Sequence, residues 1–285
     1  MRLLVTRARK IRCSPLPPNP VADKTPDKKD ARSTAVADAR GDGKSRSRAW
    51  ENFKSFASTV AIFLVLRAFI VEAYRIPSGS MVPTLLVGDW LFVNKMVYGP
   101  HIPFTKWNLP GYSNPKVGEV AVFESPYQAD EAERGADPTP TLVKRIQGGP
   151  GDTLYMRNGM LYRNGEQRPL PRGIVADTLG RDPNETNPLF DWQRKYALAQ
   201  SRFGAAPATP NHDNWGPLVI PSGYYFMMGD ARYDSKDSRY WGIVPRKNFR
   251  GRPLFVYYSY NADDSDRFAP AITDIRWSRI GTWIR

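Results

Sequence analysis

The chain has 285 residues, enough for one large hydrophobic core or two modest ones, and a formal net charge of +13. Residues 1–50 hold 13 Lys and Arg against five Asp, while the other 235 residues hold 28 basic and 23 acidic groups. Because the basic excess lies in one terminal segment, the charge argues against a nucleic-acid-binding protein. The only cysteine, Cys13, excludes an intrachain disulfide and a cysteine metal cluster, and it leaves the compartment open.

Residues 1–50 are rich in Pro, Asp, Lys, Arg, Ala and Ser, which predicts a basic, disordered tail. The next segment, FKSFASTVAIFLVLRAFIVEAYRIP, has 12 uncharged residues between Lys54 and Arg67. Extended over 51–74, it is long enough to span a bilayer if Arg67 and Glu72 lie at the outer interface. We therefore predict a membrane anchor helix over 51–74, with a buried core helix and a cleaved secretory signal as the alternatives.

The charge around the apolar segment also predicts its orientation. Fourteen basic residues precede the apolar run, and by the positive-inside rule they keep the amino terminus in the cytoplasm. Everything after Tyr74 then lies on the far side of the membrane. The acidic residues of the tail argue against an organellar transit peptide, although the pattern leaves bacterial, thylakoid and mitochondrial membranes open.

The remaining part of the chain, 75–285, has the short apolar runs bounded by Gly and Pro that are typical of strands. The runs that predict strands are 89–99, 118–126, 141–148 and 253–260. Asn158-Gly159, between two short apolar segments, predicts a β-hairpin. Residues 167–214 are rich in Pro, Asn and Asp with one helical-looking patch, DWQRKYALAQSRF, so we assign 155–218 to an inserted subdomain.

The stretch RIPSGSMVPTLLVGD, residues 75–89, follows the apolar run and contains two serines, a glycine and two prolines. Such residues build a fixed, irregular backbone, and a serine held there is either a turn former or a nucleophile. The two histidines, His101 and His212, lie in Pro/Asn-rich sequence without a recognised motif, and we interpret them as surface loop residues. A Ser-His-Asp triad stays an alternative, and a zinc site is disfavoured.

A lysine can replace histidine as the base if burial disfavours its charged form. In a strand over 141–146, Leu142, Lys144 and Ile146 share one face, so the Lys144 amine would lie between two aliphatic side chains. A lysine that reaches solvent from the strand end is the alternative. Lys95, in FVNKMVYG, satisfies the same pattern, and spacing alone does not choose between the two lysines.

A third stretch, YYFMMGDARYDSKDSRYWGIVP (224–245), begins as an apolar strand and continues into a turn rich in Gly, Ser and Asp. Taken with PSGSMVPTLLVGD, VKRIQGGPGD and the closing RWSRIG, it resembles type I signal peptidase, the membrane-bound serine protease that removes secretory signal peptides. The resemblance covers most of the chain. It implies a mainly β fold, in which a transmembrane helix precedes a signal-peptidase-type β catalytic domain (75–285, extracytoplasmic) with an inserted smaller subdomain.

The resemblance also implies a Ser/Lys dyad, with Ser80 as the nucleophile and Lys144, rather than Lys95, as the general base. The Ser78 hydroxyl and the Ser80 backbone N–H would form the oxyanion hole, whose donors stabilise the developing negative charge.

Further roles follow from the same resemblance. Ser235 would hydrogen-bond Lys144, and Asp237 and Arg239 would form a supporting ion pair. The positions that match the shallow, apolar substrate-binding subsites are Ile76, Pro77, Met81, Leu85, Leu142 and Val143. Where the family usually reads GDNRDNSxDSR, this chain reads GDARYDSKDSR, so Ala231, Tyr233 and Asp234 replace the usual residues, and Gly149 stands where an aliphatic residue is common.

We therefore expect a serine endopeptidase of the bacterial inner membrane, with a cytoplasmic amino terminus and a periplasmic catalytic domain. Its partners would be secretory preproteins, cleaved after an Ala-x-Ala-like sequence, and membrane lipid. We expect no cofactor, no metal and no nucleic acid. A peptidase for one dedicated exported substrate and an inactive membrane-tethered scaffold are the alternatives. Trp241, Trp277 and Trp283 would either contact the membrane interface or pack in the core.

Overall fold

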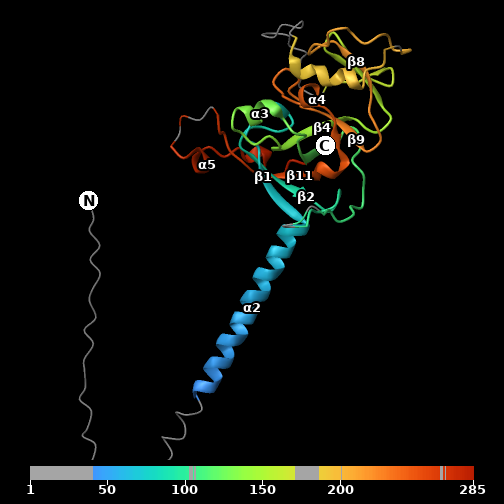
Figure 1. Ribbon diagram of the computed structural model, residues 1–285. Coiled ribbons are helices and arrows are strands. Elements are labelled where there is room, and N and C mark those ends of the chain that lie inside the picture. Colours follow the sequence, from blue (N-terminus) through green and yellow to red (C-terminus); the bar gives the residue numbers. More distant parts are fainter. Residues whose placement is uncertain are drawn as a thin grey trace, which may run out of the picture. The chain divides into compact units, whose positions relative to one another are not determined.

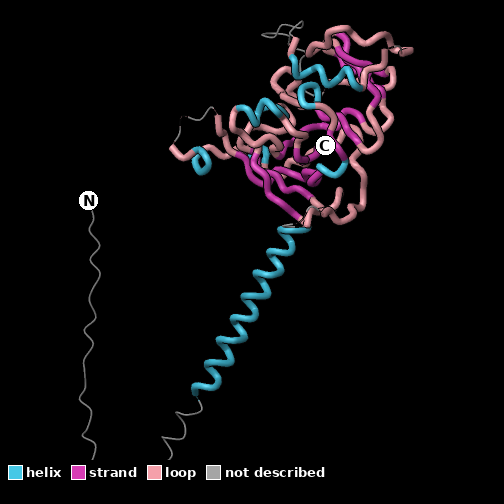
Figure 2. The backbone as a smooth tube through the Cα atoms, in the orientation of Figure 1, coloured by secondary structure: helices cyan, strands magenta, loops and turns pink. Residues whose placement is uncertain are grey.

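The computed structural model describes residues 41–285 except 103–104, 106, 171–185, 200, 264–265 and 267. Within them, seven antiparallel strands form one sheet in the order β1-β2-β11-β3-β4-β9-β10, and four form a second, β7-β6-β5-β8 (Figure 1). The tube in Figure 2 shows short strands joined by long loops, with one long helix before them. The predicted fold class, mainly β after an amino-terminal apolar helix, is confirmed.

The strands are β1 Val71–Arg75, β2 Asp89–Asn94, β3 Val120–Glu124, β4 Thr141–Gly148, β5 Thr153–Arg157, β6 Met160–Arg163, β7 Glu166–Gln167, β8 Trp215–Val219, β9 Tyr224–Met228, β10 Val244–Pro245 and β11 Phe249–Ser259. The α-helices are α2 Gly41–Phe69, α3 Ala129–Glu133, α4 Ser238–Trp241 and α5 Pro270–Thr273. Short 3-10 turns cover Gly79–Met81, Pro188–Lys195, Arg246–Asn248 and Trp277–Arg279.

The centre of the large sheet is buried on both faces. In β3, Val120 and Val122 pack into one hydrophobic cluster, while Ala121 and Phe123 pack into another. Successive side chains of a strand point to opposite faces, so this apolar run fills two cores at once. Strand β4 pairs with the whole of β3 through Thr141–Arg145 and with β9 on its other side, so it is held in the interior of the sheet.

Strand β9 joins the two sheets. Its residues Tyr225 and Met227 pack into the core of the large sheet, whereas Phe226 and Met228 pack against the second sheet. Residues Thr59–Arg285 accordingly form one compact unit. The strands of the second sheet run from β5 to β8, so they span nearly the same residues as the inserted subdomain predicted over 155–218.

The predicted hairpin at Asn158-Gly159 is confirmed. It joins β5 to β6, with φ values of 49° and 75° at the two central residues, both in the left-handed region that Asn and Gly tolerate. A second pair, Asn164-Gly165, repeats this geometry with φ values of 56° and 93° and leads from β6 into β7.

The helix predicted over 51–74 begins earlier and ends earlier than expected, since α2 covers Gly41–Phe69. Helix α2 stops at Phe69, and Val71–Arg75 form strand β1, which pairs along its whole length with β2. The backbone groups of Val71–Arg75 bond to β2, and this pairing determines their conformation more strongly than the apolar pattern that predicted a helix. The Glu72 carboxylate lies 3.2 Å from the Lys95 amine.

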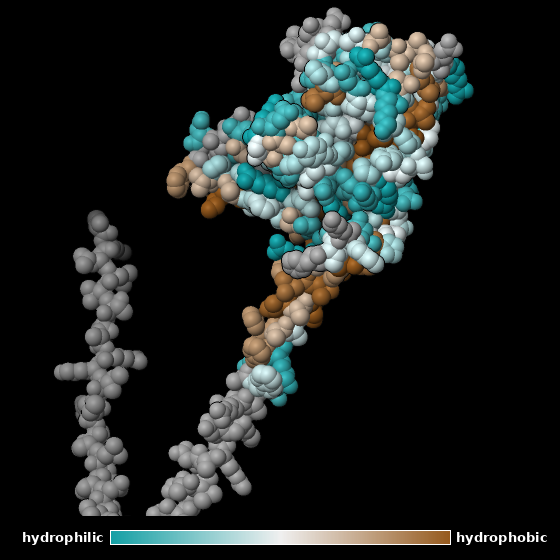
Figure 3. Space-filling model, in the orientation of Figure 1, coloured by the Kyte–Doolittle hydropathy of each residue, from teal (hydrophilic) through white to brown (hydrophobic). Residues whose placement is uncertain are grey.

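The segment Trp50–Phe69 of α2 has 20 residues, is apolar, and is long enough to cross a membrane by length and composition. At about 1.5 Å per residue it measures about 30 Å, the thickness of the hydrocarbon core of a bilayer. Its described side chains are almost all exposed, and Figure 3 shows apolar side chains, in brown, covering this part of the helix. It does not serve as a buried core helix.

Two other predicted boundaries change. The strand predicted over 89–99 ends at Asn94, because the Asn94 side chain accepts a hydrogen bond from the Met96 N–H at 3.0 Å and turns the chain. The helical-looking patch near 191–203 is a 3-10 turn, Pro188–Lys195, and the Asn187 side chain caps its first turn.

A buried carboxylate ties the start of β2 to the end of the chain. Asp89 is fully buried, and its carboxylate accepts hydrogen bonds from Arg279 at 2.5 Å and from the Ser259 hydroxyl at 2.7 Å. Arg279 also donates to the Thr84 carbonyl at 3.0 Å. Since Thr84 belongs to the irregular segment between β1 and β2, the closing segment of the chain holds that loop in place.

Replacing Asp89 by Ala should lower the free energy of unfolding by about 3–5 kcal/mol, because it leaves the inward-directed Arg279 guanidinium without its carboxylate. Chemical unfolding of the detergent-solubilised protein measures this change. The matched control is Asp191→Ala, which removes an exposed ion pair with Arg194 and should change the same free energy by less than about 1 kcal/mol. Equal losses in both variants would contradict the assignment of Asp89 as a clamp.

Candidate active site

The loop that contains Ser80 is anchored by apolar side chains at intervals along it. Ile76, Met81 and Leu85 are all buried in the same hydrophobic cluster, and the Leu85 N–H donates to the Met81 carbonyl at 2.9 Å. Ser80 lies in the 3-10 turn Gly79–Met81, and Ser78 before it is extended and exposed. The three buried side chains hold the backbone of the loop, while the side chains of Ser78 and Ser80 are not buried in that core.

Lys144 reaches this loop from β4. Its Nζ lies 2.5 Å from the Ser80 Oγ, and only 3% of the residue is exposed. Leu142 and Ile146, two residues away on either side, pack in one hydrophobic cluster, as the strand alternation predicts. Lys95 instead pairs with Glu72, so of these two lysines only Lys144 contacts Ser80.

Burial lowers the pKa of Lys144 from its ordinary 10.5 to about 8, although the nearby Asp237 carboxylate opposes this change. With a pKa of 10.5 about one amine in 3,000 is neutral at pH 7, whereas with a pKa of 8 about one in ten is neutral. A neutral amine has a free lone pair. At this distance it can accept the proton of the Ser80 hydroxyl.

Ser78 and Ser80 border the same small cavity, with their hydroxyl oxygens 3.5 Å apart. The cavity measures about 110 Å³, and of the six residues predicted to bind substrate it is lined by Ile76, Pro77, Met81, Leu142 and Val143. Leu85 is the exception. It is fully buried in the core beneath the loop, so it supports the cavity and does not line it.

The turn after β9 contains a fully buried ion pair. Arg239 Nε donates to Asp237 Oδ1 and Arg239 Nη2 donates to Asp237 Oδ2, both at 2.8 Å. Burial opposes both charges, but each group stabilises the other, so the pKa of Asp237 is lowered and the pKa of Arg239 is raised. Asp237 also accepts from the Gly229 N–H at 3.1 Å and caps helix α4.

His212 is part of this network, and the expectation of a surface loop histidine is wrong. The residue is 2% exposed, its Nδ1 lies 2.5 Å from Asp213 Oδ1, and Arg239 donates to its Nε2. A guanidinium only donates, so Nε2 accepts and the ring proton lies on Nδ1. These contacts bring together segments 27 residues apart, and no local pattern around His212 reveals them. His101 is half-buried and contacts Asn108.

Ser235 does not make the expected hydrogen bond with Lys144. Its hydroxyl is buried and has no hydrogen-bond partner among the described residues, whereas the Lys144 amine is directed at Ser80. Ser235 packs against Gly229, where an added Cβ would collide with its side chain and would lie 2.5 Å from the Ser80 carbonyl oxygen. The absence of a side chain at Gly229 therefore permits this close approach.

The turn in which this chain departs from the family sequence is well connected. The Asp230 carboxylate accepts two hydrogen bonds from Arg145, at 2.8 and 2.7 Å, and one from the Thr84 hydroxyl at 2.5 Å. The N–H of Ala231 donates to the Ser80 carbonyl at 3.2 Å. Because a backbone group makes this last contact, alanine at that position does not disturb it.

Of the three tryptophans for which a membrane contact was considered, one lies in the core and two lie at the surface. Trp241 packs against Phe123 with ring centroids 5.8 Å apart and belongs to the core of the large sheet. Trp277 and Trp283 are 73% and 66% exposed.

A serine hydroxyl beside a buried amine, with a second hydroxyl on the same small cavity, is an arrangement suited to a serine hydrolase. Residues 49–258 match the family described as signal peptidase, peptidase S26. The chain belongs to this family and is a serine endopeptidase.

Two relatives support the family assignment by sequence. Signal peptidase I of Pseudomonas aeruginosa is 37% identical over 219 residues, which cover 73% of this chain and 72% of that protein. Signal peptidase I of Buchnera aphidicola subsp. Acyrthosiphon pisum is 33% identical, over 80% of this chain and 81% of that protein. A crystal structure of a signal peptidase I from Enterococcus faecalis V583 matches 49% of this chain and 97% of that chain, at 26% identity and a TM-score of 0.28.

Replacing Gly229 by Ala should displace the Ser80 loop, because the new methyl group would lie 2.5 Å from the Ser80 carbonyl oxygen. A misplacement of about 1 Å costs up to about 100-fold in rate, so we expect kcat to fall roughly 10- to 100-fold. Cleavage of a purified preprotein measures this change. Gly149→Ala, whose methyl group would meet nothing closer than 3.7 Å, is the control and should stay near the parent rate. Unchanged turnover in Gly229→Ala would contradict the close packing described above.

Proposed function

We propose that this protein removes amino-terminal signal peptides from exported preproteins, with Ser80 as the nucleophile and Lys144 as the general base. The observation that carries the proposal is the 2.5 Å contact between the Lys144 amine and the Ser80 hydroxyl, inside an environment that lowers the pKa of the amine. The family to which the chain belongs supports the class of reaction.

In the first step the neutral Lys144 amine takes the proton of Ser80 as its Oγ attacks the scissile carbonyl carbon. The carbonyl π electrons move to the oxygen, and a tetrahedral intermediate with one negative oxygen forms. The Ser78 hydroxyl, 3.5 Å from the nucleophile, and the Ser80 backbone N–H stabilise that oxygen. Donors of this kind typically contribute about 3–4 kcal/mol each to lowering the barrier.

In the second step the intermediate collapses, the carbon–nitrogen bond breaks, and the Lys144 ammonium gives its proton to the departing amine of the mature protein. The signal peptide stays attached to Ser80 as an acyl-enzyme. A water molecule then attacks the carbonyl carbon of this ester while Lys144 accepts its proton. The bond from that carbon to Ser80 Oγ breaks, Lys144 returns the proton to Oγ, and the signal peptide leaves with a free carboxyl group. No metal or cofactor takes part in this scheme.

We assign the residues around the dyad to positioning. The Asp237–Arg239 pair fixes the turn after β9; its carboxylate raises the pKa of Lys144 and its guanidinium lowers it, so the two partly cancel at the amine. We propose that Ser235, whose buried hydroxyl has no partner among the described residues, orients the Lys144 amine when that amine turns away from Ser80 during the cycle.

The small cavity supports cleavage after an Ala-x-Ala-like sequence. Its volume of about 110 Å³ is well below the roughly 300–1,000 Å³ of pockets that hold drug-sized molecules, so side chains as small as alanine suit it. Its apolar lining, including Leu142 and Val143, suits the same side chain.

We further propose that Trp50–Phe69 anchors the protein in the bacterial inner membrane in a single pass. Basic residues on its amino-terminal side support a cytoplasmic amino terminus and an extracytoplasmic catalytic domain. The exposed Trp277 and Trp283 suit contact with the lipid interface, where tryptophan is enriched. Of the tail predicted to be disordered over 1–50, residues 1–40 lie outside the described residues, whereas residues 41–50 belong to helix α2.

Ser80→Ala should abolish cleavage of a preprotein with an Ala-x-Ala site, lowering kcat/KM on the order of 10⁴-fold or more, because the nucleophile is gone. Lys144→Arg should be equally inactive, since a guanidinium is not deprotonated in proteins. Cleavage in detergent micelles, followed on gels and by mass spectrometry of the new amino terminus, measures both effects.

Lys95→Arg is the matched control and should retain activity within about twofold, because Lys95 pairs with Glu72 and does not contact Ser80. A preprotein with Phe in place of the second Ala should resist the parent enzyme. Near-normal turnover by Lys144→Arg would move the base elsewhere, and equal cleavage of the Phe substrate would contradict the proposed specificity.

The orientation has its own test. Protease added to spheroplasts should digest the domain 75–285 and spare an epitope tag on the amino-terminal tail, because the membrane would shield the tail. Immunoblots against the tag and the domain measure this protection, and detergent-permeabilised cells, in which both should be digested, are the control. Digestion of the tail alone in intact spheroplasts would invert the proposed topology.

A further inference from the structure

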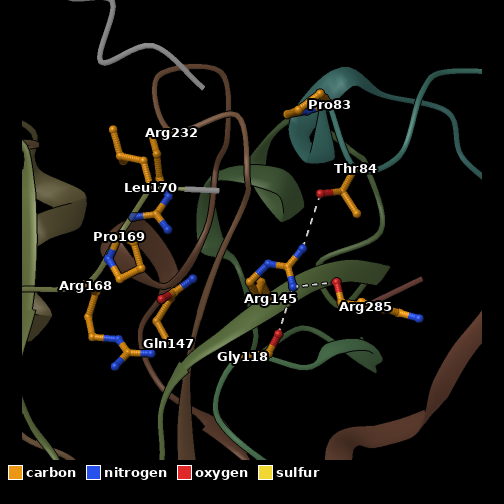
Figure 4. Close-up of a pocket in the computed structure, with 10 residues that line it drawn as sticks. All are labelled: Pro83, Thr84, Gly118, Arg145, Gln147, Arg168, Pro169, Leu170, Arg232 and Arg285. Carbon is orange, nitrogen blue, oxygen red and sulfur yellow. Dashed lines mark hydrogen bonds between the residues drawn. The ribbon is translucent and has the colours of Figure 1, made fainter. Parts of the chain in front are cut away.

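A second cavity, which shares no lining residue with the one at Ser80, lies beside strand β4 (Figure 4). It has a volume of about 700 Å³. Segments distant in the sequence border it, among them the loop that carries Thr84, the strand β4 and the chain after β7. Four of its lining residues are arginines, and among the described residues that line it none carries a carboxylate side chain. They are Arg145, Arg168, Arg232 and Arg285.

One of the four arginines is already neutralised. Arg145 forms an ion pair with Asp230 at 2.7 Å and donates to the backbone carbonyls of Gly118 and Arg285, both at 2.8 Å. Figure 4 shows the guanidinium bonded to Gly118, to Arg285 and to the Thr84 hydroxyl in the wall of the cavity. Arg145 therefore shapes the cavity, and its hydrogen-bonding capacity is used within the protein.

Arg232 and Arg168 are different. Arg232 is 4% exposed, and its Nε and Nη2 atoms are buried without a hydrogen-bond partner in the described part of the chain. The Nε atom of Arg168 is likewise buried without a hydrogen-bond partner among the described residues. Neither residue forms an ion pair with a described carboxylate. A buried N–H without a partner costs about 1–3 kcal/mol, and more when the group is charged, so these groups favour an acceptor from outside the chain.

The charge of Arg232 is only partly balanced within the protein. Burial and the neighbouring Arg239 lower the pKa of Arg232 to about 10, although Asp237 and Asp230 oppose this change, so the guanidinium stays charged at neutral pH in surroundings that on balance disfavour its charge. An anion in the cavity would add counter-charge and would supply the missing acceptors.

We propose that this cavity binds a phosphate group through Arg168 and Arg232. Guanidinium groups match phosphate and carboxylate oxygens with paired N–H donors. A phosphate group, whether free or in a phosphodiester, carries its acceptor oxygens in a tetrahedral arrangement, so it can accept from guanidinium groups on different sides of one cavity, whereas the two oxygens of a carboxylate lie in one plane. The volume also leaves room for a small organic group, so the source is either free phosphate or a phospholipid head group.

Binding there would reach the catalytic machinery by contact. Arg145 directly follows Lys144, and Thr84, which lines the cavity, belongs to the same loop as Ser80. Arg168 follows strand β7 of the second sheet, while Arg232 lies in the turn after β9. A phosphate held by both arginines would join the two sheets beside that loop.

The test uses the full-length protein in a phosphate-free maltoside detergent. Equilibrium dialysis with radiolabelled inorganic phosphate, at constant ionic strength in chloride, should give saturable binding to the parent protein. Arg168→Gln and Arg232→Gln should each weaken it roughly 10- to 100-fold, the loss expected from one charged hydrogen-bonding group. At about ten times Kd, phosphate should raise the Tm of the parent by roughly 3–6 °C. Arg168 is only half-buried, so its variant tests the site even if Arg232→Gln does not fold.

Arg163→Gln is the matched control. Arg163 lies in strand β6, near Arg168 in the sequence, is partly exposed beside Asp152 and does not line the cavity, so phosphate binding should be unchanged. Absence of saturable binding, binding unchanged in Arg168→Gln and in a folded Arg232→Gln, or an equal loss in Arg163→Gln would each overturn the proposal.

Micelles doped with phosphatidylglycerol or with uncharged diacylglycerol distinguish the two sources of the phosphate group. Displacement of labelled phosphate by phosphatidylglycerol alone assigns the site to a lipid head group, and retention of the label assigns it to free phosphate.

Discussion

The burial of one lysine amine against one serine hydroxyl is the constraint on which the rest of this structure depends. Lys144 lies on a strand that is paired on both sides, by β3 and by β9, and is covered by the loop of Ser80. Because the amine is removed from water, its pKa falls to about 8. A side chain that is ordinarily charged at neutral pH can therefore act as a base there. Neighbouring carboxylates, Asp237 most strongly, oppose this fall in the pKa of Lys144.

Buried carboxylate–guanidinium pairs supply the framework around that contact. Two of the pairs join segments far apart in the sequence, whereas Asp237–Arg239 lies within the turn after β9, and in all three the carboxylate is fully buried. Such pairs add little net stability compared with apolar packing, but removing one partner is costly, so they fix a geometry more than they strengthen a fold. The pairs are Asp89–Arg279, Arg145–Asp230 and Asp237–Arg239.

Local patterns in the sequence predicted local features well. The alternation of residues 141–146 placed Lys144 among aliphatic side chains, and Asn158-Gly159 predicted a hairpin. The features that the sequence did not reveal depend on partners far along the chain. Strand β1 forms because β2 is available to pair with it, and His212 is buried because Arg239, 27 residues away, binds it. The family motifs also assigned roles to Ser235 and Leu85. The packing shows that the Ser235 hydroxyl has no partner among the described residues and that Leu85 lies in the core beneath the cavity, and neither fact can be read from the motif.

The most direct test of the central claim is an NMR titration of the Lys144 side chain in the Ser80→Ala variant, with the signal assigned by its loss in Lys144→Arg. Buried amines titrate at lower pH than exposed ones, so the account predicts a midpoint near pH 8. A midpoint near the ordinary value of 10.5 would contradict it, because the amine would then be almost fully charged at neutral pH and unable to accept the proton of Ser80.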